Sequence, residues 1–195
     1  MKAVIDAFRN VYSKKGYVWF DGDKAYNLNI FGIRNYGRIN RFDDWLCLVY
    51  RNNRGEWVWR QYDATTMPGL KTLRTIQNPK GTAILAPGQY LGAYKIDWHA
   101  GKYEALCQRL GPVKVFRDGN RDDAYDLNPD TLDEGLFGIN LHRAGLNTET
   151  VDGYSAGCQV FRYESNFQDF MKILKTSSAM LGNKFTYTLF EKTDF

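Results

Sequence analysis

The chain contains FGINLHRAG at residues 137–145 and YSAGCQVF at residues 154–161. The first segment predicts a strand over residues 137–142 that ends on His142. Cys158 lies sixteen residues farther on (158 minus 142) and follows Gly157 in a polar turn. The interpretation of the whole chain rests on these two segments, because together they offer a thiol and an imidazole next to β-structure.

The pairing of Cys158 with His142 indicates nucleophilic catalysis. A thiolate is the reactive form of cysteine, and a free thiol is only slightly ionised at neutral pH, so it needs a base beside it. Histidine is the side chain whose pKa suits that task. Gly157 would allow a sharp turn that exposes the sulfur, and the backbone N–H groups at Gly157 and Cys158 are candidates for binding an oxyanion.

A histidine, a gap of this length and then Ser-x-Gly-Cys resembles the active-site signature of the L,D-transpeptidase catalytic-domain family. The resemblance implies a β-rich fold and a cysteine enzyme that cleaves or exchanges peptide bonds at D-configured residues of the peptidoglycan stem peptide. It implies that Cys158 is the nucleophile, that His142 is the base, and that the backbone carbonyl of Arg143 orients the imidazole. Ser155 and Gly157 match the family's residues before the cysteine.

The resemblance covers residues 82–163 and implies two substrate-binding candidates, to which His99 is added from its own position in the sequence. Residues 87–90 are similar to a Pro-x-Gly-x-Tyr/Phe turn of the family, which makes Tyr90 one candidate. Arg162 is a candidate replacement for the Arg or Asn that the family has shortly after its cysteine. His99 is a third candidate and the only alternative base. Ala156 stands where the family usually has histidine, so hydrolysis is as well supported as transpeptidation.

The rest of the chain predicts one α+β domain over residues 1–195, with a β-rich L,D-transpeptidase-like core. We expect an N-terminal helix over residues 1–15, and a C-terminal unit made of a helix from Ser165 to Met180, closed by Gly182, and a strand over 184–191. Further strands are expected at 17–20, 28–33, 45–51, 56–63, 83–86, 91–97 and 112–117, with turns at 21–23, 52–55 and 87–90. The segment 1–63 is a candidate accessory lobe.

Composition indicates a soluble globular chain. Its 195 residues are 44% hydrophobic and 25% charged, and no apolar run is long enough to cross a bilayer. The start lacks the pattern of a signal peptide, so we expect synthesis in the host cytoplasm. The chain also resembles uncharacterised proteins encoded by bacterial viruses, which implies action at the cell wall after release, or association with the virion and its proteins.

The charge pattern favours a wall polymer over nucleic acid. The net charge of +4 would help association with anionic peptidoglycan or teichoic acid. The sequence lacks the dense basic stripe that specific nucleic-acid binding needs, and we expect no membrane partner.

The remaining polar residues indicate neither a metal nor an organic cofactor. Three cysteines and two histidines give no disulfide framework and no zinc spacing. We expect Cys47 to be a buried core residue and Cys107 to be structural. The acidic stretch at 118–129 lacks glycine at position six and glutamate at position twelve of a calcium loop.

Two alternatives to an enzyme stay open from the sequence. The first is a catalytically inactive structural or cargo protein of a virus particle. The second is a cell-wall-binding module in which Trp57 and Trp59 stack on sugar rings, although such residues more often cover a second layer of the fold.

Overall fold

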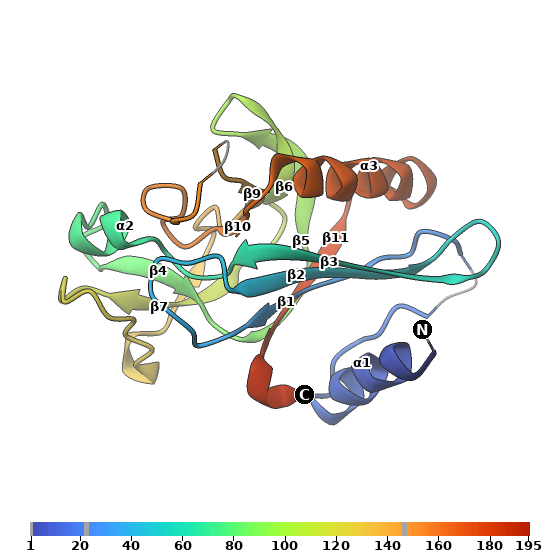
Figure 1. The fold of residues 1–195 in the computed structure, drawn as a ribbon, viewed down its shortest axis with the longest axis horizontal. Coiled ribbons are helices and arrows are strands. Elements are labelled where there is room, and N and C mark those ends of the chain that lie inside the picture. Colours follow the sequence, from blue (N-terminus) through green and yellow to red (C-terminus); the bar gives the residue numbers. More distant parts are fainter. Residues whose placement is uncertain (1, 22–23, 146–147) are drawn as a thin grey trace.

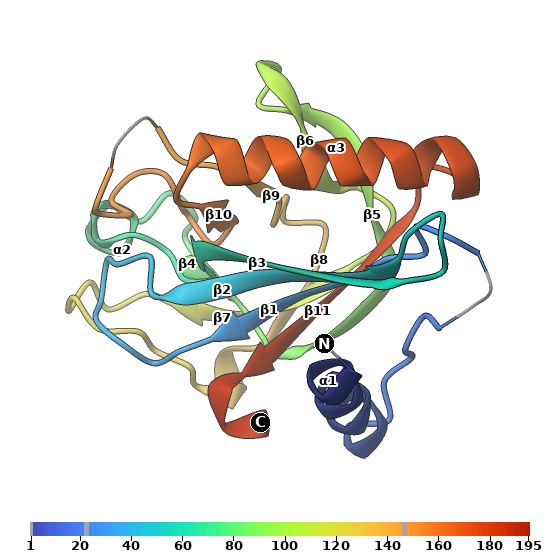
Figure 2. The ribbon, with the colours of Figure 1, turned by 45° about the vertical axis from the view of Figure 1, so that its right-hand side comes forward.

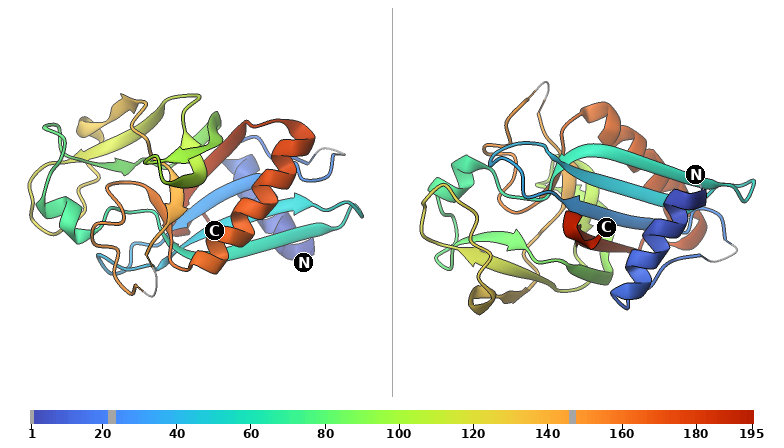
Figure 3. Two further views of the ribbon diagram at one scale, coloured as in Figure 1. Left: turned by 90° about the horizontal axis from the view of Figure 1, so that it is seen from above. Right: turned by 60° about the horizontal axis from the view of Figure 1, so that its bottom comes forward.

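A computed structural model describes residues 2–21, 24–145 and 148–195. The chain is a mixed α+β protein rich in strands, with an N-terminal helix and a C-terminal helix followed by a strand. Figure 1 shows the helices α1 and α3 on opposite sides of strands β1, β2 and β3, and the views of Figure 3 agree. The predicted α+β class is therefore confirmed at this level.

Within the described residues, eight strands close into a barrel in the order β1-β11-β5-β6-β9-β10-β3-β2. Their bounds are β1 Asn29–Arg34, β2 Asp44–Arg51, β3 Trp57–Thr65, β5 Gly88–His99, β6 Tyr103–Gln108, β9 Leu141–Arg143, β10 Gln159–Phe161 and β11 Phe185–Glu191. A smaller sheet has the order β4-β7-β8, with β4 Thr82–Leu85, β7 Val113–Asp118 and β8 Asp133–Gly135. Short helical turns are α2 Leu70–Arg74, η1 Pro129–Thr131 and η2 Lys192–Asp194.

The same strands contribute side chains to two hydrophobic layers, one inside the barrel and one on its outer face. In β2, Leu46 and Leu48 belong to the cluster inside the barrel, whereas Cys47 and Val49 belong to a cluster on its outer face. Successive side chains of a strand point to opposite faces, so a strand that is covered on both sides reads as one continuous apolar run. This explains why β2 is almost wholly buried.

Helix α1 (Lys2–Lys14) covers the outer face of the barrel, and the predicted N-terminal helix is confirmed over these residues. Its buried residues are Ile5, Phe8, Val11 and Tyr12. Phe8 packs edge-on against Phe31 of β1 and Trp59 of β3, with ring centroids 4.9 and 5.8 Å apart. The face that carries Trp57 and Trp59 therefore packs in the layer beneath α1.

Helix α3 (Glu164–Leu181) lies across the opposite side of the barrel, as Figure 2 shows. Phe167, Phe170 and Leu174 belong to the same cluster as the side chains inside the barrel. The predicted apolar face and the closing Gly182, at a φ of 94°, are confirmed. The helix begins two residues earlier than expected, because its N-cap is Tyr163 rather than Ser165.

Three predicted local structures are wrong. Residues 17–20 form no strand, since the side chain of Gln89 bonds both backbone groups of Val18 and that of Asn29 bonds those of Phe20. Residues 87–90 are not a turn, because β5 begins at Gly88. Only Leu141 and His142 of the strand expected at 137–142 are in β9. The turn expected at 21–23 falls partly outside the described residues.

A boundary at residue 63 would cut β3, which runs from Trp57 to Thr65. Strands β1, β2 and β3 are members of the same barrel as β5, β6 and β9 to β11. The strands of the segment considered as an accessory lobe are therefore part of the central sheet. None of the described helices is both long and apolar enough to cross a membrane.

Candidate functional site

The candidate site lies on the pair of parallel strands β9 and β10. Leu141 is paired with Gln159 and His142 with Val160. Leu141 lies in the barrel core, so His142, one residue on, faces the other side of the sheet. Val160 also faces that side and packs with Cys158. Cys158 and His142 are thus on the same face of the strand pair.

His142 is held in one tautomer. Its Nδ1 lies 2.9 Å from the backbone oxygen of Arg143, an acceptor, so Nδ1 carries the hydrogen and Nε2 is left as the acceptor. Burial, and after it the neighbouring His99, lower the pKa of His142 to about 3. His142 is therefore neutral at pH 7. The contact with the Arg143 carbonyl is the one that the family resemblance implies.

Cys158 is a half-buried neutral thiol. Its Sγ donates to the backbone oxygen of Gly138 at 3.4 Å. Burial raises the pKa of Cys158 to about 11, and the backbone N–H of Asn140 lowers it in part. Among residues 2–21, 24–145 and 148–195, no hydrogen bond joins Cys158 to His142. The two side chains lie on the same face of β9 and β10, but the Cys158 thiol is hydrogen-bonded to Gly138 instead of His142.

The turn before Cys158 is built by Ser155 and Gly157. Ser155 Oγ donates to the oxygen of Cys158 at 2.8 Å and accepts from the N–H of Gly157 at 3.2 Å. The N–H of Gly157 is therefore used inside the turn, and the expectation that it binds an oxyanion is not met. Gly157 has a φ of 117°, and a Cβ there would lie 2.3 Å from the oxygen of Ala83.

A cavity of about 380 Å³ opens beside Cys158. It is lined mainly by small, uncharged or apolar residues: Thr72, Gln77, Asn78, Gly81, Thr82, Ala83, Arg117, Leu136, Phe137, Gly138, Ile139, Ala156 and Cys158. Arg117 is the charged side chain among them. Its guanidinium donates to Asp133 at 3.1 Å and to the oxygen of Gly81 at 3.3 Å. Because this charge is paired with Asp133, the cavity suits an uncharged backbone segment.

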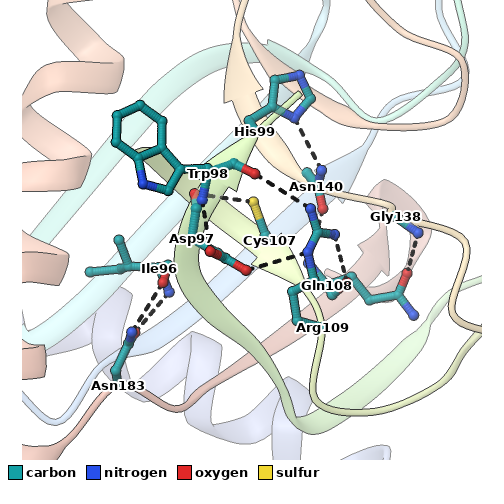
Figure 4. A network of polar contacts seen from close by, with 10 residues as sticks. All are labelled: Ile96, Asp97, Trp98, His99, Cys107, Gln108, Arg109, Gly138, Asn140 and Asn183. Atoms are coloured by element: carbon teal, nitrogen blue, oxygen red, sulfur yellow. Dashed lines mark hydrogen bonds and ion pairs between the residues drawn. The ribbon is translucent and has the colours of Figure 1, made fainter. Parts of the chain in front are cut away.

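His99 lies beside His142, although nothing in the sequence indicates that these two candidate residues are neighbours. The two imidazoles are stacked, with centroids 4.1 Å apart. His99 Nδ1 lies 3.0 Å from Nδ2 of Asn140, as Figure 4 shows. Neither histidine lines the cavity at Cys158.

Tyr90 and Arg162, two substrate-binding candidates, do not line the cavity. Tyr90 is buried, and its hydroxyl donates to the oxygen of Ala86 at 2.6 Å, because this part of the chain is strand β5 rather than a turn. Arg162 follows the far end of β10, and its guanidinium lies over the ring of Tyr163 at 4.9 Å. Neither residue is therefore placed to contact a substrate in this cavity.

Gln108 is a site residue that the sequence reasoning missed. Its Oε1 accepts from the N–H groups of Phe137, Gly138 and Ile139 at 2.8 to 3.1 Å. Its Nε2 donates to the oxygens of Gly111 and Gly135. Figure 4 shows this amide beside Gly138. The backbone oxygen of Gly138 accepts the hydrogen bond from the Cys158 thiol. No sequence signal points to it, since Gln108 lies about thirty residues before that loop.

The other cysteines and the acidic stretch are separate from the site. Cys47 and Cys107 are buried, which confirms the prediction for Cys47. Asn120 in the acidic stretch donates to Asp122 and Asp126. In the part of the chain that the structure describes, no three His, Cys, Asp or Glu side chains are grouped as metal ligands.

Comparison with known proteins gives no relative: no protein-family model, no curated protein and no solved structure matches the chain at a significant level.

Proposed function

We propose that the chain is a cysteine enzyme that forms a thioacyl intermediate at Cys158 with His142 as general base. The observation that carries the proposal is the fixed tautomer of His142: Nδ1 donates to the Arg143 carbonyl, and Nε2 is free to accept a proton on the face that Cys158 shares. The cavity beside Cys158 supplies room for the acyl group.

The chemistry follows from a neutral thiol and a neutral imidazole. As Sγ attacks the carbonyl carbon of an amide, His142 Nε2 takes the thiol proton, so that the proton leaves during bond formation. The tetrahedral intermediate collapses to a thioester, and His142 returns the proton to the departing amine. Water or a second amine then attacks the thioester, and the Cys158 thiol is restored. Burial raises the pKa of Cys158, so a preformed thiolate would be scarce at pH 7, which favours this concerted route.

The substrate class that we propose is the stem peptide of bacterial peptidoglycan, with cleavage or cross-linking as the outcome. The support is the resemblance of His142, Ser155, Gly157 and Cys158 to the L,D-transpeptidase signature, and the net charge of +4, which suits an anionic wall. Delivery would follow release from the host cell or occur within a virion.

The test is digestion of purified peptidoglycan by the native chain, Cys158→Ala and His142→Gln, with the soluble products analysed by mass spectrometry. We expect new stem-peptide products from the native chain and none from either variant, while circular dichroism shows that both variants are folded. Products that persist in Cys158→Ala, or a native chain that changes no stem peptide, would overturn the proposal.

A second candidate is an inactive structural or cargo protein of a virus particle. The observation that favours it is the thiol of Cys158, which is bonded to Gly138 and not to His142. It predicts a chain that is found in purified particles and is never acylated at Cys158. The packing of Trp57 with Trp19 and of Trp59 with Phe8 weighs against the wall-binding alternative, because these ring contacts compete with stacking on a sugar.

A further inference from the structure

The two histidines of the chain form one stacked pair. Their rings lie 4.1 Å apart at an interplanar angle of 19°. They come from different parts of the barrel, His99 from the end of β5 and His142 from β9. A stacked arrangement couples their charges directly, because a proton on one ring lies over the face of the other.

Hydrogen bonds give the two rings opposite tautomers. The amide of Asn140 is oriented by its Oδ1, which accepts from the N–H of Gln108 at 2.9 Å. Its Nδ2 is therefore a donor toward Nδ1 of His99, so His99 carries its hydrogen on Nε2. His142 carries its hydrogen on Nδ1, bonded to the Arg143 oxygen. Figure 4 shows the path from Gln108 through Asn140 to His99.

The surroundings of the pair are unfavourable for a second positive charge. The cations that face it are Lys102 in the turn after β5, Arg109 after β6 and Arg143 in β9. Arg109 lies 3.5 Å from Asp97, and Arg143 lies 3.7 Å from Glu164 of α3. The other titratable neighbours, Tyr103 of β6 and Cys158, are neutral, since burial raises the pKa of both.

We propose that His99 is a positioning residue for His142 and that the stacked pair accepts only one proton. When His99 is neutral, its ring supports His142 and leaves Nε2 of His142 able to take the Cys158 proton. When His99 is protonated, its charge prevents His142 from accepting a second proton, and the base is disabled. His99 is the less buried of the two rings, so solvent protons reach it first. The catalytic consequence rests on the proposed function.

The test is an NMR titration of both imidazoles, which is simple to assign because the chain has only two histidines. In the native chain we expect ¹⁵N shifts of an Nε2–H tautomer for His99 and an Nδ1–H tautomer for His142. His99 should titrate below its usual range, because burial, Arg109 and Lys102 lower its pKa, and His142 should stay neutral throughout that titration. In His99→Phe, which keeps a stacking ring, we expect the midpoint of His142 to rise by about one pH unit.

Two further variants keep the result interpretable. Tyr103→Phe removes a hydroxyl 3.5 Å from Nδ1 of His142 and should leave both midpoints unchanged. His99→Gln offers an oxygen to Asn140 without an imidazole and replaces His99→Phe if that variant does not fold. Equal His142 midpoints in the native chain and the His99 variant, or an Nδ1–H tautomer at His99, would overturn the proposal.

An activity arm separates the inference from the proposed function. The rate of Cys158 acylation falls at acidic pH, and in His99→Phe this fall should occur at lower pH. The reason is that the ring that is protonated first has been removed. The NMR arm needs no turnover. A coupled pair without acylation would therefore reject only the proposed function, whereas acylation with independently titrating rings would reject only the inference.

Discussion

Gly157 is the residue on which the shape of the Cys158 turn depends most. Its φ of 117° lies in a region that residues with a Cβ rarely adopt, and the Ala83 oxygen lies only 2.3 Å from the position that a Cβ would take. A neighbouring strand thus approaches the backbone just before the thiol. The glycine of the Gly-Cys motif is needed for packing, in addition to any part in catalysis.

Replacing Gly157 by alanine should destabilise the chain by about 2 kcal/mol or more, since the change combines strained backbone with a clash against backbone. Gly55→Ala is the matched control: Gly55 also has a positive φ, of 74°, but nothing lies within 4 Å of its Cβ position. Urea unfolding of both variants measures the difference. Equal losses of stability would show that the clash with Ala83 does not exist.

The pKa of Cys158 makes a prediction about pH. Because burial raises it to about 11, the rate of alkylation by iodoacetamide should keep rising from pH 7 to pH 10. Mass spectrometry of the folded chain should find the label at Cys158, since Cys47 and Cys107 are buried. A rate that levels off below pH 8 would instead indicate a thiolate paired with a charged imidazole.

At the scale of elements, helices and strands with a periodic apolar pattern could be predicted from the sequence. Hydrogen bonds from side chains to distant parts of the backbone could not. The apolar faces of α1 and α3 and the hairpin β2–β3 follow from spacing and turn residues, and each is present. Residues 17–20 look like a strand, but their backbone is bonded by side chains of Gln89 and Asn29. Strands β8 and β10 have three residues each, too few to show a period.

The loop over residues 135–139 depends on Gln108 of β6. Gln108→Ala would leave one buried N–H group, two part-buried N–H groups and two carbonyls without this partner, and we expect a loss of about 2 kcal/mol or more. Gln168→Ala on the exposed side of α3 should stay within about 0.5 kcal/mol of the native chain. Thermal unfolding compares them. A small effect at Gln108 would mean that the loop is held by other contacts.

At the scale of the whole molecule, closure of the barrel could not be predicted from local sequence. Strand β1 pairs in parallel with β11, so that Ile30 lies opposite Tyr187 near the other end of the chain. No local pattern specifies such a partner. The sequence predicted the α+β class and most of the strands, and the register of β9 and β10 places His142 next to the strand that begins directly after Cys158. Tyr90 was expected in a turn, but this part of the chain is strand β5.

The shared barrel predicts one cooperative unfolding transition. Four of the five tryptophans, Trp19, Trp45, Trp57 and Trp59, lie in the first 63 residues, so fluorescence reports mainly on that part, while far-UV circular dichroism reports on the whole chain. The two urea curves should coincide. An earlier fluorescence transition would show that residues 1–63 unfold as a separate lobe.

The most direct test of the account is the acylation of Cys158 by p-nitrophenyl acetate at pH 7, followed by intact and peptide mass spectrometry. We expect a single acetyl group on Cys158, formed about 10²-fold to 10⁴-fold more slowly in His142→Gln, which is the usual contribution of a general base. Equal rates in the two chains, or acetylation elsewhere than Cys158, would contradict the claim that His142 activates this thiol.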